Sequence, residues 1–388
     1  MIGVGLVAGA AVGAVATARA RGLTLPREQP SSMANWEHAQ YIATMMNKSD
    51  ALSSQARTEL TAQYRELVER CLPLVGDYMR ITIPNPVERT FAFDRVDWIN
   101  ANIEAFRNLL APIDEFMLHP GQRRSVISAL LGTVNREVVS SEMGVLLGYL
   151  SRRVLGQYDL ALLGGESPGP GKLYFVQPNI EQTEAMLNLP ADQFRLWLSL
   201  HETTHVFQFE GFPWVRPYFQ QLLNEYFEFL KSDLSELRKG MKSIRVMVDR
   251  VRSNHGRQSW IESLMTPEQR GVFYRIQALM CIIEGYSNHV MNAVGKDLMP
   301  NYETIAKRFE QRQRKRGRSE QLLARITGLD VKLEQYRLGE AFIDQIIARR
   351  GPEVALRLWH GPEALPTLDE LRSPESWIAR LVEPANAS

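Results

Sequence analysis

The chain has 388 residues, 45% of them hydrophobic, which is enough for a large core in one domain or in two closely packed domains. Its formal net charge of +1 excludes a strongly basic or strongly acidic protein and implies no oppositely charged partner. Only Cys71 and Cys281 are present, both in apolar helical patterns. They exclude a disulfide framework and a cysteine zinc site, and buried free thiols favour the reducing cytoplasm.

The N-terminal segment, residues 1–21, is apolar. Residues 2–18 are wholly apolar or small, and Arg19 and Arg21 follow them. This run is close to the minimum for a membrane span, and arginines on its downstream side would place the body of the protein in the cytoplasm. A signal peptide is disfavoured because no Lys or Arg precedes the apolar run. The alternative to membrane contact is a helix packed on the protein's own surface or in an oligomer.

Residues 22–35 contain Pro, Ser and Arg and are typical of a linker, so we expect the folded domain to span residues 36–388. The first part of this domain shows the 3.6-residue apolar period of helices. The chain is therefore predicted to be mainly α. The helical patterns cover residues 36–46, 54–75, 96–118 and 123–155.

Three short stretches have a β-like pattern instead. Thr90 to Phe93 is one, and residues 158–163 and 172–176 are the other two. A loop rich in Gly and Pro, residues 164–171, joins the last two as a hairpin. A strand just before the next helix would suit edge pairing with an extended peptide, and a purely structural hairpin explains the pattern equally well. We therefore expect a small hairpin or sheet next to that helix.

The helix after the hairpin carries the most informative motif of the chain. Pro190 and Asp192 are typical of a helix start, and Gly211 is placed to end it. In His201-Glu202-Thr203-Thr204-His205, two histidines four residues apart share one helix face, so both imidazoles can reach one metal ion. Glu202 lies beside the first histidine, where it can take a proton from an activated water. The alternative is a helix whose histidines are merely buried and hydrogen-bonded.

A third metal ligand is predicted in the apolar helical stretch of residues 273–294. Glu284 lies in its middle, and a lone buried carboxylate is costly unless it is paired or bound to a metal. Two histidines and one glutamate form a known catalytic zinc set. The alternatives are a salt bridge to Arg275, or His289 as the ligand, although His289 lies about 140° round the helix from Glu284. Asn288, one turn after Glu284, is expected to orient a liganding histidine.

The chain between residues 307 and 318 holds a basic run that would suit nucleic acid or anionic lipid. It has no interleaved aromatic residues, so a solvated helix end is the favoured interpretation and no nucleic-acid partner is expected. Residues 331–347 form a further helical pattern that contains Tyr336. Tyr336 is a candidate donor to an oxyanion, with a core tyrosine as the alternative.

Short motifs spread along the chain carry a family resemblance. They are Leu155 to Asp159, Pro178 to Ile180, Phe194 to Trp197, His201 to His205 with Gln208-Phe209 and Pro213-Trp214, Glu284-Gly285, and Lys332 to Tyr336. Together they resemble the actinobacterial and chloroflexus-type family of zincin-like metallohydrolases, often labelled as associated with deazaflavin-cofactor biosynthesis, over residues 34–383. The resemblance implies a mostly helical zincin-like protein with an HExxH metal site and no particular substrate. Relatives commonly carry Asp where this chain has Asn288, which weakens the expected catalysis but not metal binding.

The residues together predict a zinc-dependent hydrolase, most of all a metallopeptidase that cleaves a peptide or amide bond. Glu202 would accept a proton from the attacking water and deliver it to the leaving amine. Tyr286, His289 and Tyr336 are the candidate donors to the tetrahedral oxyanion. The alternative class is a metal-binding scaffold or partner-binding protein without turnover, which Asn288 and the apolar N-terminus favour.

Overall fold

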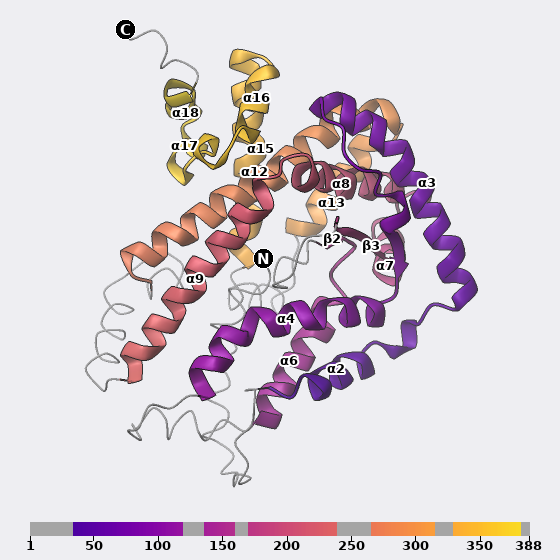
Figure 1. Cartoon of the computed structure of the whole chain (residues 1–388). Coiled ribbons are helices and arrows are strands. Elements are labelled where there is room, and N and C mark those ends of the chain that lie inside the picture. The colour runs from indigo at the N-terminus through magenta and orange to yellow at the C-terminus, as the bar shows by residue number, and fades with distance from the viewer. Residues whose placement is uncertain (1–33, 119–135, 160–169, 239–264, 315–328, 382–388) are drawn as a thin grey trace.

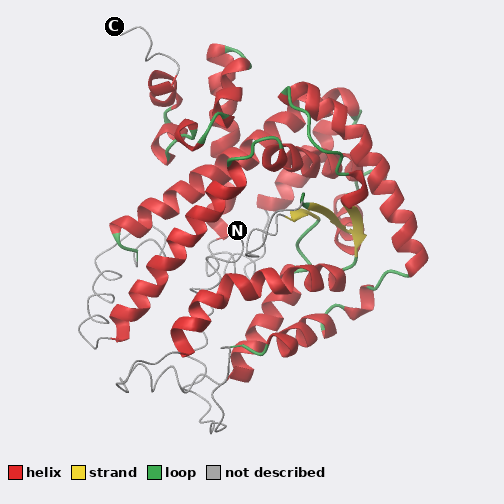
Figure 2. Cartoon of the chain, viewed as in Figure 1, coloured by secondary structure: helices red, strands yellow, loops and turns green. Residues whose placement is uncertain are grey.

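A computed structural model describes residues 34–118, 136–159, 170–238, 265–314 and 329–381 of the chain, mainly as α-helices with one small sheet (Figure 1). Figure 2 shows how small the sheet is beside the helices that surround it. The prediction of a mainly α protein is confirmed. The predicted N-terminal segment and most of the predicted linker lie outside the described residues, so those domain boundaries stay predictions.

The first helices form two groups. Helix α2 (Trp36–Met45) packs against α4 (Arg95–Leu118) and α6 (Arg136–Leu150), around a cluster that includes Trp98. Helix α3 (Ser54–Met79) belongs to the main core instead. It packs against the helix that carries the two motif histidines.

Helix α6 is shorter than the pattern predicted, because it ends at Leu150 and the chain turns into a strand at Gly156. The side-chain amide of Asn179 donates to the carbonyls of Ser151 (2.7 Å) and Val154 (2.6 Å), which compensates for the helical bonds those carbonyls lack. Residues 123–135 of the predicted helix lie outside the described part of the chain.

The sheet contains three strands in the order β1-β3-β2. Strand β1 (Thr90–Phe93) runs parallel to β3 (Lys172–Val176), and β2 (Gly156–Asp159) pairs with β3 antiparallel. The predicted β-hairpin pairing is confirmed. Its first strand begins two residues earlier than expected, and residues 160–169 are not described. Strand β2 forms one edge of the sheet among the described strands and lies against the histidine-bearing helix.

In the described part of the chain, helices follow the sheet. The first of them are α7 (Gln177–Leu187), α8 (Ala191–Glu210), α9 (Val215–Arg238) and α12 (Pro267–Leu298). Helix α8 starts after Pro190 and is capped by Gly211, as predicted. It is largely buried and packs against α3, β2 and α12, so the motif histidines lie at the centre of the fold.

The C-terminal helices also pack against α12. Helix α13 (Tyr302–Arg314) contacts α7, α8 and α12, and α15 (Leu329–Arg350) packs along α12. The short helices α16 (Glu353–Leu356), α17 (Leu368–Arg372) and α18 (Pro374–Leu381) gather beside α15 (Figure 1).

Helices α12 and α15 approach so closely that their backbones touch. A Cβ atom at Gly285 would lie 2.3 Å from the carbonyl carbon of Gly339, and one at Gly339 would lie 1.9 Å from the carbonyl oxygen of Cys281. Only glycine fits at either position. This crossing turns the Gly285 side of α12 toward α15, which leaves Glu284 on the side that faces α8.

Two other sequence predictions meet the structure here. Cys71 and Cys281 are free and buried, as expected, and burial raises the pKa of both thiols to about 12. In the basic run, Arg308 donates to the carbonyls at the end of α7 and Arg312 donates to Thr183. Arg308 thus caps the C-terminal end of α7, and Arg312 bonds to a side chain of the same helix. Among the described helices, none combines the length and apolar character that a membrane crossing requires.

Candidate metal centre

The structure brings His201, His205 and Glu284 together at the contact between α8 and α12. The two Nε2 atoms lie 3.2 Å apart, and each lies 3.8 Å from Oε2 of Glu284. All three side chains are 13 to 20% exposed, so the cluster is accessible but mostly enclosed. The ligand atoms lie within 4.8 Å of one another, and this is the group among the described residues that could hold a metal ion.

The spacing of these three atoms fits zinc. Ligands about 2.0–2.2 Å from zinc in a tetrahedron are about 3.4 Å from one another, close to the three separations found here. Arg275, the alternative partner considered for Glu284, forms an ion pair with Glu225 instead, at 2.6 Å. The two imidazoles and one carboxylate thus form a donor set that zinc prefers, with a fourth position left for water or substrate.

Two side chains lie within hydrogen-bonding distance of Nδ1 of His205. Its Nδ1 lies 2.8 Å from Oε1 of Gln208 and 3.3 Å from Oγ of Ser287. Gln208 is fully buried, and its Nε2 donates to the backbone carbonyl of Ile283 at 2.7 Å. The spacing of the motif predicts no role for Gln208, although Gln208-Phe209 is one of the stretches that carry the family resemblance.

The ring of His201 has an aromatic ring and a thioether as neighbours. It lies parallel to the indole of Trp197, with ring centroids 6.3 Å apart and planes 6° apart, and its Nδ1 lies 3.1 Å from the sulfur of Met291. A thioether is a weak hydrogen-bond acceptor. The weak contact with Met291 and the parallel indole of Trp197 both lie against this ring.

Glu202 is buried and lies against strand β2. A Cβ atom at Gly156 would come 2.6 Å from Oε1 of Glu202 and 2.8 Å from its Cδ. The absence of a side chain at Gly156 therefore makes room for the Glu202 carboxylate, which is 5% exposed as a residue. The sequence motif predicts the role of Glu202, but it does not indicate that residue 156 must lack a side chain.

The two residues of strand β2 that follow Gly156 hydrogen-bond to neighbouring helices. The amide of Gln157 accepts from the indole of Trp98 at 2.6 Å and donates to Asn102 at 2.9 Å, both on α4. The hydroxyl of Tyr158 donates to Glu210 at the end of α8, at 2.6 Å. These bonds hold the strand between α4 and α8 and keep Gly156 opposite Glu202.

The backbone of β2 also presents polar groups at the edge of the sheet. The N–H of Val176 donates to the carbonyl of Leu155 at 2.8 Å, in the same register that pairs Gly156 with Phe175. Hydrogen-bonded pairs alternate in an antiparallel ladder, so the N–H and C=O of Gly156 point away from β3. These two backbone groups of Gly156 are directed outward from the edge of the described sheet, next to Glu202.

Asn288 does not contact a liganding histidine, so the predicted orienting role is wrong for this residue. Its amide donates to Glu340 on α15 at 3.3 Å, and Asn292 donates to the same carboxylate at 2.8 Å. The close crossing of α12 and α15 brings Glu340 to this face of α12. The side chains that bond to Nδ1 of His205 are those of Gln208, which comes from α8 itself, and Ser287.

Two of the three candidate oxyanion donors, His289 and Tyr286, are not brought to the candidate metal ligands. His289 bonds to Tyr78 at 2.5 Å and to Asp344 at 2.8 Å, which places it on another side of α12 from Glu284. Tyr286 is fully buried with its ring edge-on to Trp359, and burial raises its pKa. Tyr336 belongs to α15, but its side chain is outside the described residues.

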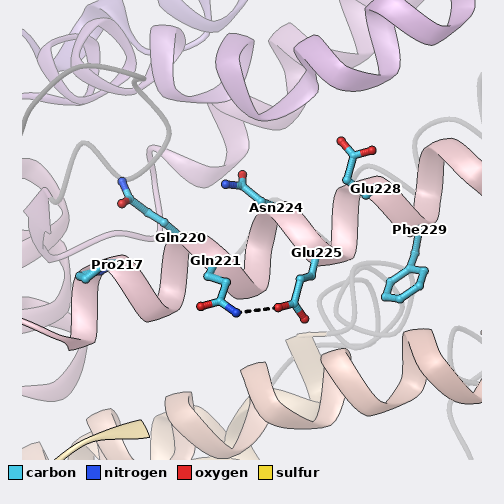
Figure 3. Close-up of a pocket in the computed structure, with 7 residues that line it drawn as sticks. All are labelled: Pro217, Gln220, Gln221, Asn224, Glu225, Glu228 and Phe229. Carbon is cyan, nitrogen blue, oxygen red and sulfur yellow. Dashed lines mark hydrogen bonds between the residues drawn. The ribbon is translucent and has the colours of Figure 1, made fainter.

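A separate hollow lies along α9, lined by side chains between Pro217 and Phe229 (Figure 3). The amide of Gln221 donates to Glu225 there at 2.8 Å. None of the three candidate ligands lines this hollow, so we do not connect it with the chemistry of the metal centre.

A mostly helical fold with two motif histidines on one helix and a glutamate on a second helix packed against it is the arrangement of a zincin-type metal centre. The chain belongs to the zincin-like metallopeptidase family, whose model matches residues 34–378. It is also similar to a crystal structure from Chloroflexus aurantiacus, described as a candidate hydrolase with a novel fold. The two are 40% identical, the match covers 90% of this chain and 99% of that chain, and the TM-score is 0.67. No curated protein matches the sequence.

Proposed function

We propose that the protein is a zinc-dependent hydrolase, and specifically a metallopeptidase that cleaves a peptide or amide bond. The observation that carries this proposal is the meeting of two imidazole Nε2 atoms and one carboxylate oxygen at zinc-like separations. Membership of the zincin-like metallopeptidase family supports it. The link to deazaflavin-cofactor biosynthesis, a cytoplasmic location and membrane contact through residues 1–21 stay predictions.

His201, His205 and Glu284 would hold the zinc ion. The chemistry that zinc supplies in such a site is polarisation of the substrate carbonyl and acidification of a water molecule. Glu202 takes the proton from the attacking water and transfers it to the leaving nitrogen. Its burial against Gly156 holds the carboxylate in one place, so little reorganisation is needed during the transfer.

An extended substrate would pair with strand β2. The N–H and C=O of Gly156 are directed away from β3, and this residue touches the proposed base. A peptide that bonds to these groups would have its backbone beside Glu202 without using any substrate side chain. Edge pairing therefore suits peptide or amide substrates better than small non-peptide ones.

The alternative class, a metal-binding scaffold without turnover, rested partly on Asn288. An amide in place of a carboxylate would weaken catalysis if it oriented a zinc ligand. Asn288 contacts Glu340 instead, so this argument does not apply. No other feature of the described centre favours the scaffold over the enzyme.

Metal content tests the site directly. Purified full-length protein should contain about one zinc per chain, and His205→Ala should lose most of it because one of three protein ligands is gone. His289→Ala is the matched control, because that histidine lies on the same helix as Glu284 but bonds to Tyr78 and Asp344. Elemental analysis of the three proteins decides. Equal zinc in all three, or loss only in His289→Ala, would refute the ligand set.

Gly156→Ala should impair hydrolysis without removing zinc. The new methyl group would occupy space 2.6 Å from Oε1 of Glu202 and force that carboxylate to move. A displacement of about 1 Å in a catalytic group costs about 10²-fold in rate. Gly271→Ala is the control, since a Cβ there meets no described atom within 4 Å. Turnover and zinc content are measured for both, and wild-type turnover in Gly156→Ala would contradict the assigned contact.

A further inference from the structure

The contact of Gln208 with His205 determines which nitrogen of that ring carries the proton. The Nε2 of Gln208 donates to the carbonyl oxygen of Ile283, at 2.7 Å. A backbone carbonyl can only accept, so the amide group cannot be turned the other way. The amide oxygen of Gln208 therefore faces Nδ1 of His205, 2.8 Å away.

An amide oxygen is also an acceptor only. At 2.8 Å from it, Nδ1 of His205 must carry a hydrogen, because two lone pairs at this distance would repel. The ring is then the Nδ1–H tautomer, and the lone pair of Nε2 points toward His201 and Glu284. The lone pair of Nε2 is the one that a metal ion requires for binding through this nitrogen.

Ser287 alone would leave the choice of tautomer open. Its hydroxyl lies 3.3 Å from Nδ1 and can either donate or accept. With Gln208 present, the hydroxyl can only share the Nδ1 proton. Without Gln208, it could donate to Nδ1 and allow the proton to move to Nε2, which would block the metal-binding lone pair.

We propose that Gln208 is a positioning residue that holds His205 in the Nδ1–H tautomer and so prepares it to bind zinc. The inference rests on the proposed function in one respect, which is that His205 is a zinc ligand. Gln208 acts through two contacts. The carbonyl of Ile283 on α12 fixes the amide of Gln208 on α8, and the amide oxygen of Gln208 fixes the ring of His205. Gln208 itself touches neither the metal nor the substrate.

The tautomer can be measured in metal-free full-length protein, so the test does not depend on activity. The chain has 7 histidines, and imidazole nitrogen-15 NMR at a pH well above the ordinary imidazole range separates the two tautomers of each. The signals of His205 are assigned by their loss in His205→Gln. The wild type should show His205 as Nδ1–H. A wild-type ring in the Nε2–H form would overturn the proposal without any variant of Gln208.

Two substitutions separate the tautomer from general stability. Gln208→Leu removes the acceptor, so the proton should move toward Nε2 and zinc affinity, measured by chelator competition, should fall about 10- to 100-fold. Gln208→Glu keeps an acceptor for Nδ1–H but loses the bond to Ile283. It should therefore keep the tautomer even where the fold is less stable. Asn288→Ala is the control and should change neither tautomer nor affinity.

The outcomes divide clearly. If Gln208→Leu folds and keeps the Nδ1–H tautomer, or if Asn288→Ala loses it, the positioning role is wrong. If Gln208→Leu does not fold, the wild type and Gln208→Glu decide by their tautomer. If the tautomer follows Gln208 as expected but no protein binds zinc, the proposed function fails while the contact stands.

Discussion

Replacing Glu202 by Gln should lower the rate of peptide hydrolysis by about 10²- to 10⁴-fold, while zinc content and fold stay unchanged. Glutamine has nearly the same shape as glutamate, so it still fits against Gly156. It cannot accept the proton of the attacking water. The loss should therefore appear in turnover and not in zinc binding. The measurement is cleavage of a mixed peptide substrate, read by mass spectrometry, next to zinc per chain.

The matched control for this change is Glu184→Gln. Glu184 is also buried, and it forms an ion pair with Arg195 of α8 at 2.9 Å. The same chemical substitution there should reduce stability but leave the chemistry of the metal centre intact. Equal turnover in wild type and Glu202→Gln would remove Glu202 from the mechanism. Zinc binding without turnover in the wild type would instead favour the scaffold alternative.

Gly339→Ala should cause the largest loss of stability among the substitutions considered. Its Cβ would lie 1.9 Å from the carbonyl oxygen of Cys281, which is a backbone atom of α12 and cannot move without the helix. Overpacking of this kind costs about 3 kcal/mol in free energy of unfolding. Denaturant unfolding of the full-length protein measures it. Because α12 carries Glu284, zinc affinity should fall as well.

Gly271→Ala is the internal comparison for Gly339→Ala. Gly271 lies in open space on α12, the helix that Gly339 of α15 contacts, so this substitution should be neutral or should stabilise the protein by up to about 1 kcal/mol. A destabilisation of equal size in both variants would mean that the α12–α15 approach is not as close as described. Wild-type stability in Gly339→Ala would lead to the same conclusion.

Local spacing explains why the sequence predicts the two histidine ligands. His201 and His205 lie on one helix, and four residues of helix bring two side chains together in any protein. The same local rule, applied to α12, separates Glu284 from His289 by about 140°. Glu284 was predicted because an apolar helix with one central carboxylate needs a partner for it. The structure places that carboxylate with the two histidines.

The contact of Asn288 differs from the predicted one because helical spacing within α12 does not specify which neighbouring helix a side chain meets. Asn288 does lie one turn after Glu284, but which neighbour it meets depends on α15. The glycines at the crossing let α15 come close enough for Glu340 to reach Asn288. Nothing in the spacing of α12 alone indicates that approach.

The sequence by itself therefore determined the mainly α fold class, the hairpin pairing of β2 with β3 and the residues that could bind a metal, because each depends on a repeat, a spacing or a buried charge within one segment. Only the tertiary structure decided the surroundings of that metal centre. Gln208 holds His205, and Gly156 makes room for Glu202. These contacts join α8 to α12 and to β2, and their partners follow from how the segments are rotated against one another. That rotation is set by packing, above all where the backbones of α12 and α15 touch.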